Sequence, residues 1–310
     1  MQTLGRSDTE GAAPGPGEAA PESHLAGFFH VGFGAAELGL LALGATLHVL
    51  AMPPFDLWFL GPFILTPLLV VLRGKSPRVA LSCGFLFGSM AYVGGLHWFA
   101  GLFGAFAVGF WGLLALFCGA FAGLFALLQR WWGYRRALLI APPLWLAVDF
   151  VRCELWPLAY VWLSLGYSLH SQPWLLAVAS LVGVYGLTLL LAASSAALAA
   201  LLSLRDRWAS SYVTVVALVG VTLVLAAPGT SAPQTAAAAT TRVRLVQVED
   251  NLTLGLRLAA SPGLQPNTVV VFPEYATLDS PLQQPGIRRG LASFARRHRV
   301  YLLVGCVEYH

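Results

Sequence analysis

The stretch Gly104 to Gln129, GAFAVGFWGLLALFCGAFAGLFALLQ, decides the fold class of this chain. It contains no charged side chain, and about 20 apolar residues in a helix are enough to cross the hydrocarbon core of a membrane. Other apolar runs follow one another between residues 27 and 227, separated by charges and by prolines that cannot continue a helix. The sequence therefore predicts a polytopic α-helical membrane bundle. About seven spans are expected, at 30–51, 55–73, 78–98, 104–129, 136–153, 174–204 and 211–227.

The composition supports a membrane protein. Of the 310 residues, 57% are hydrophobic and only 10% are charged, whereas soluble globular domains carry about 25% charged residues. This excludes a soluble globular protein. The net charge of +4 comes from scattered arginines and a single lysine, Lys75, so the basic stripe that nucleic-acid binding needs is missing. The four cysteines show no CxxC or Cys/His spacing, so no metal site is expected.

The loop charges predict the orientation of the bundle, because cytoplasmic loops carry an excess of Lys and Arg. Eight such residues lie in the loops after the second, fourth and sixth spans, and the alternate loops hold only Arg152. We therefore expect these three loops and the amino terminus in the cytoplasm, and the segment after the seventh span on the opposite side. The eight residues are Arg73, Lys75, Arg78, Arg130, Arg135, Arg136, Arg205 and Arg207.

The chain divides into four predicted regions. Residues 1–26 are rich in Gly, Pro and Ala, which predicts a disordered cytoplasmic tail. Residues 27–227 form the transmembrane helical domain, and the small residues of 228–241 form a linker. Residues 242–310 change character and begin an extracytoplasmic α/β domain.

The last region shows the pattern of a small parallel sheet. Three short apolar or alternating runs, at 242–248, 268–272 and 300–304, predict strands, and residues 286–299 have helical spacing with arginines on one face. Buried strands of this kind belong to α/β layers. Three strands and about one helix cannot bury both faces of such a sheet, so we expect this domain to be incomplete. The shortness of the stretch after Gln247 makes a full helix before the second strand doubtful.

Polar side chains in and beside the spans are candidates for function or for structural pairing. Asp149 and Arg152 lie three residues apart on one helical face, which predicts an ion pair that supports the aromatic loop 153–172. His97 and Trp98 end the third span and either border a groove through which lipid enters or anchor the helix at the interface. Tyr167, in the aromatic loop, is a further candidate for substrate contact.

Glu274 is the candidate catalytic residue, in the segment Val-Val-Val-Phe-Pro-Glu-Tyr-Ala of 269–276. It follows a buried strand, and the carboxyl ends of parallel strands form the edge where open α/β folds place their sites. A partly desolvated carboxylate there can act as a general base. The spacing alone favours a solvated glutamate in a turn over a catalytic one. Tyr275, the next residue, is a further candidate for substrate contact.

Eight segments in order along the chain resemble those of one family. They are Met52-Pro-Pro-Phe-Asp-Leu-Trp58, the Gly-Gly-Leu-His-Trp98 end of the third span, Ala141-Pro-Pro-Leu-Trp to Arg152, Leu165-Gly-Tyr-Ser168, Gly183-Val-Tyr-Gly186, Arg244-Leu-Val-Gln247, Phe272-Pro-Glu-Tyr275 and Leu303-Val-Gly305. In this order they resemble the apolipoprotein N-acyltransferases. These are bacterial inner-membrane enzymes that carry a nitrilase-type (carbon-nitrogen hydrolase) αββα domain on a helical bundle.

The resemblance implies an activity and its partners. Such enzymes transfer a fatty acyl chain from a phospholipid to the amino-terminal amine of diacylglyceryl-cysteine lipoproteins, through a cysteine thioester and without a cofactor. The implied partners are the phospholipid donor, the diacylated apolipoprotein and the membrane. The implied location is the inner membrane with the nitrilase-like domain in the periplasm. In the Glu, Lys, Cys triad of the family, Glu274 corresponds to the base.

The other two members of the triad have no counterpart in this sequence. The single lysine, Lys75, lies in a predicted cytoplasmic loop, and Cys306 lies on the third strand, where we expect a packing cysteine. We therefore expect a truncated chain that is itself inactive. Two alternatives stay open, a non-catalytic relative that binds lipid or lipoprotein, and a membrane-tethered amidase of the nitrilase type.

Overall fold

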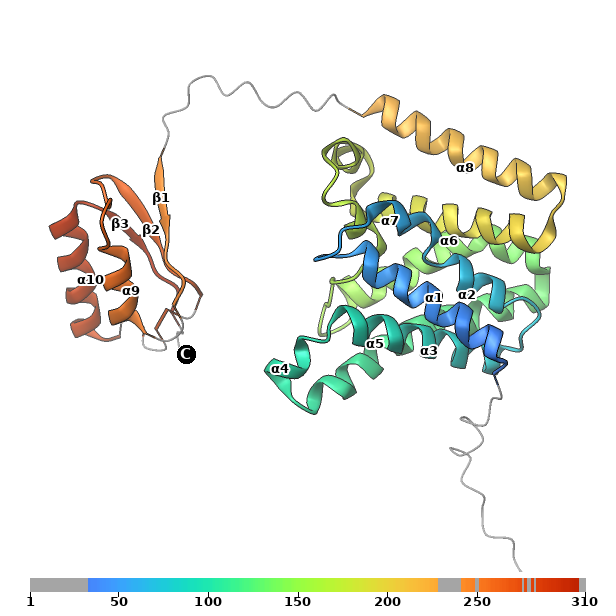
Figure 1. Ribbon diagram of the computed structural model, residues 1–310, viewed down its shortest axis with the longest axis horizontal. Helices are drawn as coiled ribbons and strands as arrows, with labels where there is room; N and C mark the ends of the chain where they lie inside the picture. Colours follow the sequence, from blue (N-terminus) through green and yellow to red (C-terminus); the bar gives the residue numbers. More distant parts are fainter. Residues whose placement is uncertain are drawn as a thin grey trace, which may run out of the picture. The chain divides into compact units, whose positions relative to one another are not determined.

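The computed structural model describes residues 33–227, 241–248, 251–274, 276–277, 280–281 and 283–306. The chain divides into two compact units, Met1–Thr230 and Ser231–His310. The first unit is helical, and the second is a small α/β layer (Figure 1).

The helical unit has helices at the positions of all the predicted spans. Its elements are α1 (Ala35–Ala51), a 3-10 helix (Trp58–Phe63), α2 (Thr66–Val71), α3 (Pro77–Gly95), α4 (Phe99–Phe103), α5 (Phe106–Trp132), α6 (Tyr134–Phe150), a π-helical turn (Val151–Leu155), a 3-10 helix (Leu165–Leu169), α7 (Pro173–Leu204) and α8 (Arg207–Ala226). Within the described residues, three helices are long and apolar enough to cross a membrane, namely α5, α7 and α8. The unit is therefore a membrane helical region.

The second predicted span is not one continuous helix. The run 55–73 breaks into the 3-10 helix and α2, because Pro62 and Pro67 each lack the backbone donor that a continuous helix needs. Ser195 of α7 satisfies the backbone at the break. Its hydroxyl donates to the Pro62 carbonyl oxygen at 2.8 Å and lies 3.2 Å from the Leu65 amide nitrogen. Broken helices are tolerated at membrane depth where a neighbouring helix supplies such partners.

Small residues bring α3 and α5 into close contact. Gly84 and Gly88 are spaced as in GxxxG, the spacing that lets two membrane helices approach closely. A Cβ atom at Gly84 would lie 2.3 Å from the Cys118 carbonyl oxygen, and one at Gly88 would lie 2.9 Å from the Cys118 Cβ atom. Cys83 and Cys118 are buried at this contact.

Two of the predicted cytoplasmic loops meet the end of α7. Arg73 donates a hydrogen bond to the Ser203 carbonyl oxygen at 2.6 Å. Arg135 forms an ion pair with Asp206, which caps α8. The loops after α2, α5 and α7 therefore lie at the same end of the helical unit.

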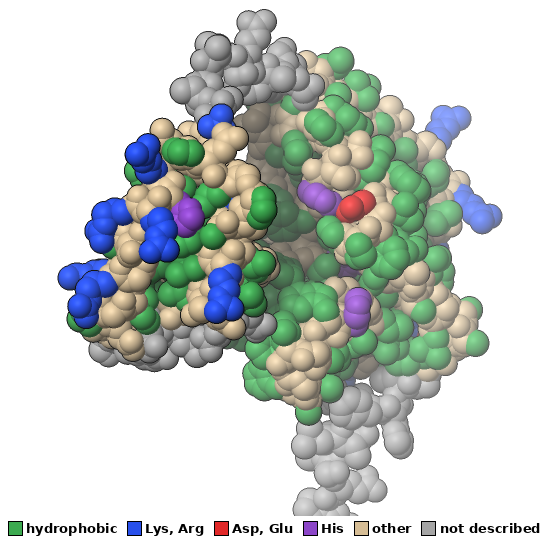
Figure 2. Space-filling model, turned by 60° about the vertical axis from the view of Figure 1, so that its left-hand side comes forward, with side chains coloured by type: hydrophobic (Ala, Val, Ile, Leu, Met, Phe, Trp, Pro, Cys, Tyr) green, Lys and Arg blue, Asp and Glu red, His purple; other side chains and the backbone are tan. Residues whose placement is uncertain are grey.

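Helix α8 is covered by the rest of the unit on a small part of its surface. Ala209 is its one buried residue. A groove of about 230 Å³ runs between α7 and α8 and is lined mostly by apolar side chains, such as Leu190 and Val213. Figure 2 shows hydrophobic side chains over much of the visible surface of the helical unit. This surface suits contact with lipid rather than water.

The α/β unit contains the predicted parallel sheet. Strands β1 (Arg242–Leu245), β2 (Thr268–Val271) and β3 (Tyr301–Leu303) pair in the order β1-β2-β3, all parallel. The predicted helix is α10 (Pro285–His298). The helix that the sequence left in doubt is present as the short α9 (Leu252–Ala259). Asn251 caps α9, because its side-chain oxygen accepts a hydrogen bond from the Leu254 amide at 2.9 Å.

One face of this sheet is covered and the other is open within the described residues. Helices α9 and α10 both lie over the same face (Figure 1), where Val270 and Phe272 belong to the buried core of the unit. On the open face, Leu245 is 77% exposed and Leu303 is 62% exposed. Alternate residues of a strand point to opposite faces, so the open face is apolar.

Candidate functional site

The helical unit contains a pocket of about 460 Å³ at the end of α1 and α3. Its lining residues are mostly apolar: Met52, Pro53, Gly95, Leu96, Trp98, Val161, Trp162, Leu163 and Tyr167. They come from four segments of the chain, namely the ends of α1 and α3, the loop 156–164 and the 3-10 helix that follows it. The volume is in the range of small-molecule sites, which are mostly apolar.

The structure brings together two of the candidates for substrate contact and excludes a third from the pocket. Trp98 and Tyr167 both line the pocket, although they are 69 positions apart in the sequence. The Trp98 ring lies against that of Trp162, with 5.1 Å between centroids. His97 is exposed and is not part of the lining; its Nδ1 atom donates to the Gly94 carbonyl oxygen at 3.1 Å.

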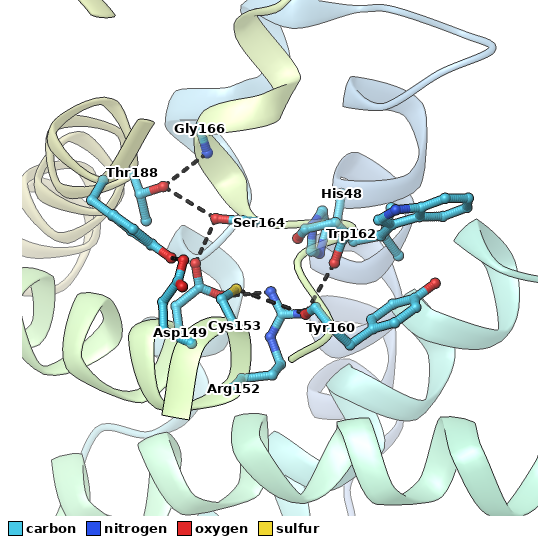
Figure 3. A network of polar contacts seen from close by, with 12 residues as sticks. His48, Asp149, Arg152, Cys153, Tyr160, Trp162, Ser164, Gly166 and Thr188 are labelled. Carbon is cyan, nitrogen blue, oxygen red and sulfur yellow. Dashed lines mark hydrogen bonds and ion pairs between the residues drawn. The ribbon is translucent and has the colours of Figure 1, made fainter. Parts of the chain in front are cut away.

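The predicted pair of Asp149 and Arg152 is present and deeply buried (Figure 3). Arg152 Nη2 lies 2.6 Å from Asp149 Oδ1, and the two side chains are 2% and 4% exposed. Arg152 Nη1 donates to the carbonyl oxygens of Tyr160 at 2.7 Å and Trp162 at 3.0 Å. The pair therefore supports the aromatic loop, as the sequence predicted. A π-helical turn, Val151–Leu155, carries Arg152.

The second carboxylate oxygen of Asp149 extends the network toward α7. Ser164 Oγ donates to Asp149 Oδ2 at 2.5 Å and lies 3.3 Å from Thr188 Oγ1. The Thr188 hydroxyl in turn accepts a hydrogen bond from the Gly166 amide at 3.0 Å. A side chain larger than glycine has no room at Gly166, because its Cβ atom would lie 2.4 Å from the Val184 carbonyl oxygen. The loop is thereby joined to both α6 and α7.

His48 joins the same loop to α1. Its Nε2 atom donates to the Leu163 carbonyl oxygen at 2.9 Å, and its side chain is 3% exposed. Tyr160 packs its ring against Phe110, with 5.0 Å between centroids. Burial raises the pKa of Tyr160 to about 12, so this phenol stays neutral at neutral pH.

Most of the lining residues were not singled out as site residues from the sequence. Met52, Pro53, Gly95 and Leu96 lie within segments that resemble the family, but nothing in their types indicated a common pocket. His48 is a polar residue within an apolar run, and this does not indicate which loop it contacts. The sequence contained one signal for the pocket, because three of the segments that form it lie at the ends of predicted spans. Residues at span ends come together when the helices pack.

In the α/β unit, Glu274 lies where the sequence placed it along the chain. It is exposed, in a turn just beyond the carboxyl end of β2. The backbone of Glu274 is in close contact with Gly305, beyond the end of β3. A Cβ atom at Gly305 would lie 2.3 Å from the Glu274 carbonyl oxygen and 2.5 Å from its Cα atom. Tyr275 lies outside the described residues.

Cys306 is not the packing cysteine that the sequence predicted. Its side chain is exposed. The reason is its position, since β3 ends at Leu303 and Cys306 forms only an isolated bridge with Thr277. The single lysine, Lys75, belongs to the helical unit, where it pairs with Glu37.

Comparison with known proteins identifies the family of the chain. Residues 44–197 match the family model of the apolipoprotein N-acyltransferase N-terminal domain. This range contains every lining residue of the pocket and every side chain of the buried network. The chain belongs to the apolipoprotein N-acyltransferase family.

Curated apolipoprotein N-acyltransferases resemble the chain over different lengths. The protein of Azotobacter vinelandii (strain DJ) is 33% identical over 299 residues, covering 86% of this chain and 56% of that protein. The proteins of Vibrio vulnificus (strain CMCP6) and Methylococcus capsulatus (strain Bath) are 31% and 33% identical, covering 57% and 59% of this chain and 37% and 39% of theirs. The chain thus spans between about a third and just over half of these relatives.

One of these alignments reaches the second unit. The helical unit comprises 230 of the 310 residues. An alignment that covers 86% of the chain must therefore include part of the α/β unit. The resemblance to the apolipoprotein N-acyltransferase of Azotobacter vinelandii is not confined to the helices.

Proposed function

We propose that this protein transfers a fatty acyl chain from a phospholipid to the amino-terminal amine of a diacylglyceryl-cysteine lipoprotein. The observation that carries the proposal is the apolar pocket, which is formed where three of the family-like segments meet. Its volume and its lining suit an acyl chain, and its ring of aromatic side chains gives such a chain a large apolar contact area. The donor's acyl chain is the occupant that we assign to it.

Glu274 is the general base of the proposed reaction. It takes the proton of a cysteine thiol, and the thiolate attacks the ester carbonyl of the phospholipid. The acyl–oxygen bond breaks, the lysophospholipid leaves with the proton, and a thioester remains. The lipoprotein amine then attacks the thioester, which forms the amide and returns the thiol. The position of Glu274 beyond β2 supports this role, because catalytic groups of open α/β sheets gather at that edge.

The Lys and the Cys of the family triad have no counterpart among the 310 residues. Lys75 is paired with Glu37 in the helical unit. The residues that follow Cys306 in the sequence do not match the family's segment around the nucleophilic cysteine. The proposed reaction therefore needs a lysine and a cysteine that these 310 residues do not supply, and the chain covers only 37% to 56% of the relatives compared. We expect the 310-residue chain alone to be inactive.

The proposed arrangement has about seven spans, with the pocket and the α/β unit on the periplasmic side of the inner membrane. The meeting of the basic loops at one end of the helical unit supports it, because these loops carry most of the positive charge. Helix α1 begins at that end, where Glu37 contacts Lys75, and reaches the pocket at Met52. The open apolar face of the sheet supports a nitrilase-type sandwich, in which a second sheet covers the first.

The test is an acyl-transfer assay on membranes that contain the full-length protein, with a phospholipid donor and a diacylated lipopeptide acceptor. The Glu274→Gln variant should lose at least about 100-fold in rate, because general-base catalysis contributes a factor of 10² to 10⁴. The Glu37→Gln variant removes a carboxylate of the helical unit that contacts Lys75, and it should keep its rate within about twofold.

Two results would count against the proposal. If the Glu274→Gln variant still forms the acylated cysteine at the wild-type rate, Glu274 is not the base. If the wild type releases ammonia from small amides and leaves the lipopeptide unchanged, the protein is an amidase of the nitrilase type.

A further inference from the structure

Part of the wall of the pocket is formed by a segment without regular secondary structure. Residues 156–164 form turns between the π-helical turn and the following 3-10 helix, and Val161, Trp162 and Leu163 of this segment line the pocket. Such a segment lacks the regular backbone hydrogen bonds of a helix or a strand, and a buried backbone group without a partner costs free energy. Its carbonyl groups therefore need partners from elsewhere in the chain.

Two buried side chains supply those partners. Arg152 donates to the carbonyl oxygens of Tyr160 and Trp162, which precede and follow Val161. His48 donates to the carbonyl oxygen of the next residue, Leu163. Three of four consecutive carbonyl groups, at positions 160 to 163, are thus held by side chains from two different helical segments.

Neither of these side chains belongs to the lining of the pocket. Arg152 is 1% exposed and His48 is 3% exposed, and the residues that line the pocket include neither. Arg152 is further fixed by Asp149, whose other carboxylate oxygen accepts from Ser164 of the same loop. The direct contacts of Arg152 and His48 with the pocket wall are hydrogen bonds to the backbone of residues 160–163.

We infer that Arg152 and His48 are positioning residues that hold the pocket open before an acyl chain enters. By fixing the backbone on both sides of Val161, they keep the Trp162 ring against Trp98, where the two rings form part of the wall. A binding site that is already formed avoids the entropic cost of ordering its wall on binding. This inference rests on the proposed function, because it takes the acyl chain as the occupant of the pocket.

The guanidinium group suits this task in a way that an ammonium group does not. Arg152 uses two of its nitrogens in three directions at once, toward Asp149 and toward the carbonyl oxygens of Tyr160 and Trp162. Arginine presents its donors in a planar fork, whereas lysine is a flexible point charge. The Arg152→Lys variant should keep the charge beside Asp149 and lose the fixed geometry of the loop.

The experiment uses the full chain in lipid nanodiscs and a phosphatidylethanolamine whose acyl chain carries a diazirine group. After illumination, mass spectrometry measures acyl-chain labelling of pocket peptides relative to labelling of the groove between α7 and α8. That groove is lined by residues such as Leu190 and Val213 and provides an internal reference for contact with lipid. In the wild type, labelling of the pocket should exceed labelling of the groove.

The Arg152→Lys variant should lose about 5-fold to 100-fold of the relative pocket labelling, the factor that corresponds to unpaired buried hydrogen-bonding groups. Labelling of the groove should not change. The matched control is Arg135→Lys, at the end of the unit with the basic loops, which should label like the wild type. The His48→Ala variant releases the Leu163 carbonyl group without leaving an unpaired charge, and it should also lower pocket labelling. It provides the test in case the Arg152→Lys variant does not fold.

The outcomes separate the inference from the proposed function. If the wild-type pocket is labelled no more than the groove, the pocket does not take an acyl chain and both fail. If the wild-type pocket is labelled strongly and both folded variants label it equally well, the proposed function stands and the positioning role of Arg152 and His48 is overturned.

Discussion

At the scale of single residues, the candidate base depends on a glycine 31 positions away. Gly305 lies so close to Glu274 that a Cβ atom would be 2.5 Å or less from three backbone atoms of Pro273 and Glu274. The sequence predicted that Glu274 would follow a buried strand, but it could not predict this contact. Contacts between strand ends depend on strand order, which became visible only in the structure.

The Gly305→Ala variant should therefore loosen the turn that carries Glu274. Overpacking of this kind costs about 1–3 kcal/mol. We expect hydrogen exchange of the peptide 268–277 to become about 10-fold to 100-fold faster, since about 1.4 kcal/mol corresponds to a factor of 10. The measurement is exchange followed by mass spectrometry on the full chain.

A second glycine in the same unit provides the control. Gly290 lies within α10, and a Cβ atom there would meet nothing within 4 Å. The Gly290→Ala variant should keep the wild-type exchange rate in 268–277. Equal rates in the Gly305→Ala variant would show that the turn has room for the side chain and would contradict the close packing of Glu274.

At the scale of elements, the sequence predicted where helices would occur better than it predicted their continuity. Apolar runs located the long helices of the helical unit, because hydrophobicity is a local property, whereas α4, the 3-10 helix Leu165–Leu169 and the short α9 were not predicted. The break in 55–73 depends on Ser195, more than 120 residues away, whose hydroxyl and backbone satisfy the freed groups. The ion pair of Asp149 and Arg152 was predictable from spacing on one helix, but its contacts to the carbonyl groups of Tyr160 and Trp162 were not.

The close contact between α3 and α5 leads to a second prediction, which concerns thermal stability. The Gly84→Ala variant places a methyl group 2.3 Å from the Cys118 carbonyl oxygen, so the helices must move apart. Its melting temperature in detergent should fall by several degrees, because overpacking a close helix contact costs about 1–3 kcal/mol. The measurement is a thermal scan of the purified protein.

An open position on α5 is the matched control for this prediction. A Cβ atom at Gly112 would meet nothing within 4 Å. The Gly112→Ala variant should melt at the wild-type temperature or slightly above it, because alanine favours the helix. If Gly84→Ala melts like Gly112→Ala, then α3 and α5 do not pack through this glycine.

At the scale of the whole molecule, the proposed function depends on which side of the membrane the candidate site of each unit faces. Apolar runs predicted a helical membrane region and the strand pattern of 242–310 predicted an α/β unit, and a helical unit and an α/β unit are both present. Sequence reasoning could not find the pocket, since its lining comes from four separate segments. The proposed reaction requires that Tyr167 of the pocket and Glu274 face the same side, opposite the basic loops.

Cysteine accessibility tests this requirement most directly. Of the native cysteines, Cys83, Cys118 and Cys153 are buried and Cys306 is exposed. The Cys306→Ser substitution therefore removes the exposed native thiol before a new cysteine is introduced. In intact spheroplasts, a membrane-impermeant maleimide should label the Tyr167→Cys and Glu274→Cys variants and should label Arg135→Cys only after permeabilisation. Labelling of Glu274→Cys only after permeabilisation would place the candidate base on the side of the basic loops and would contradict the proposed function.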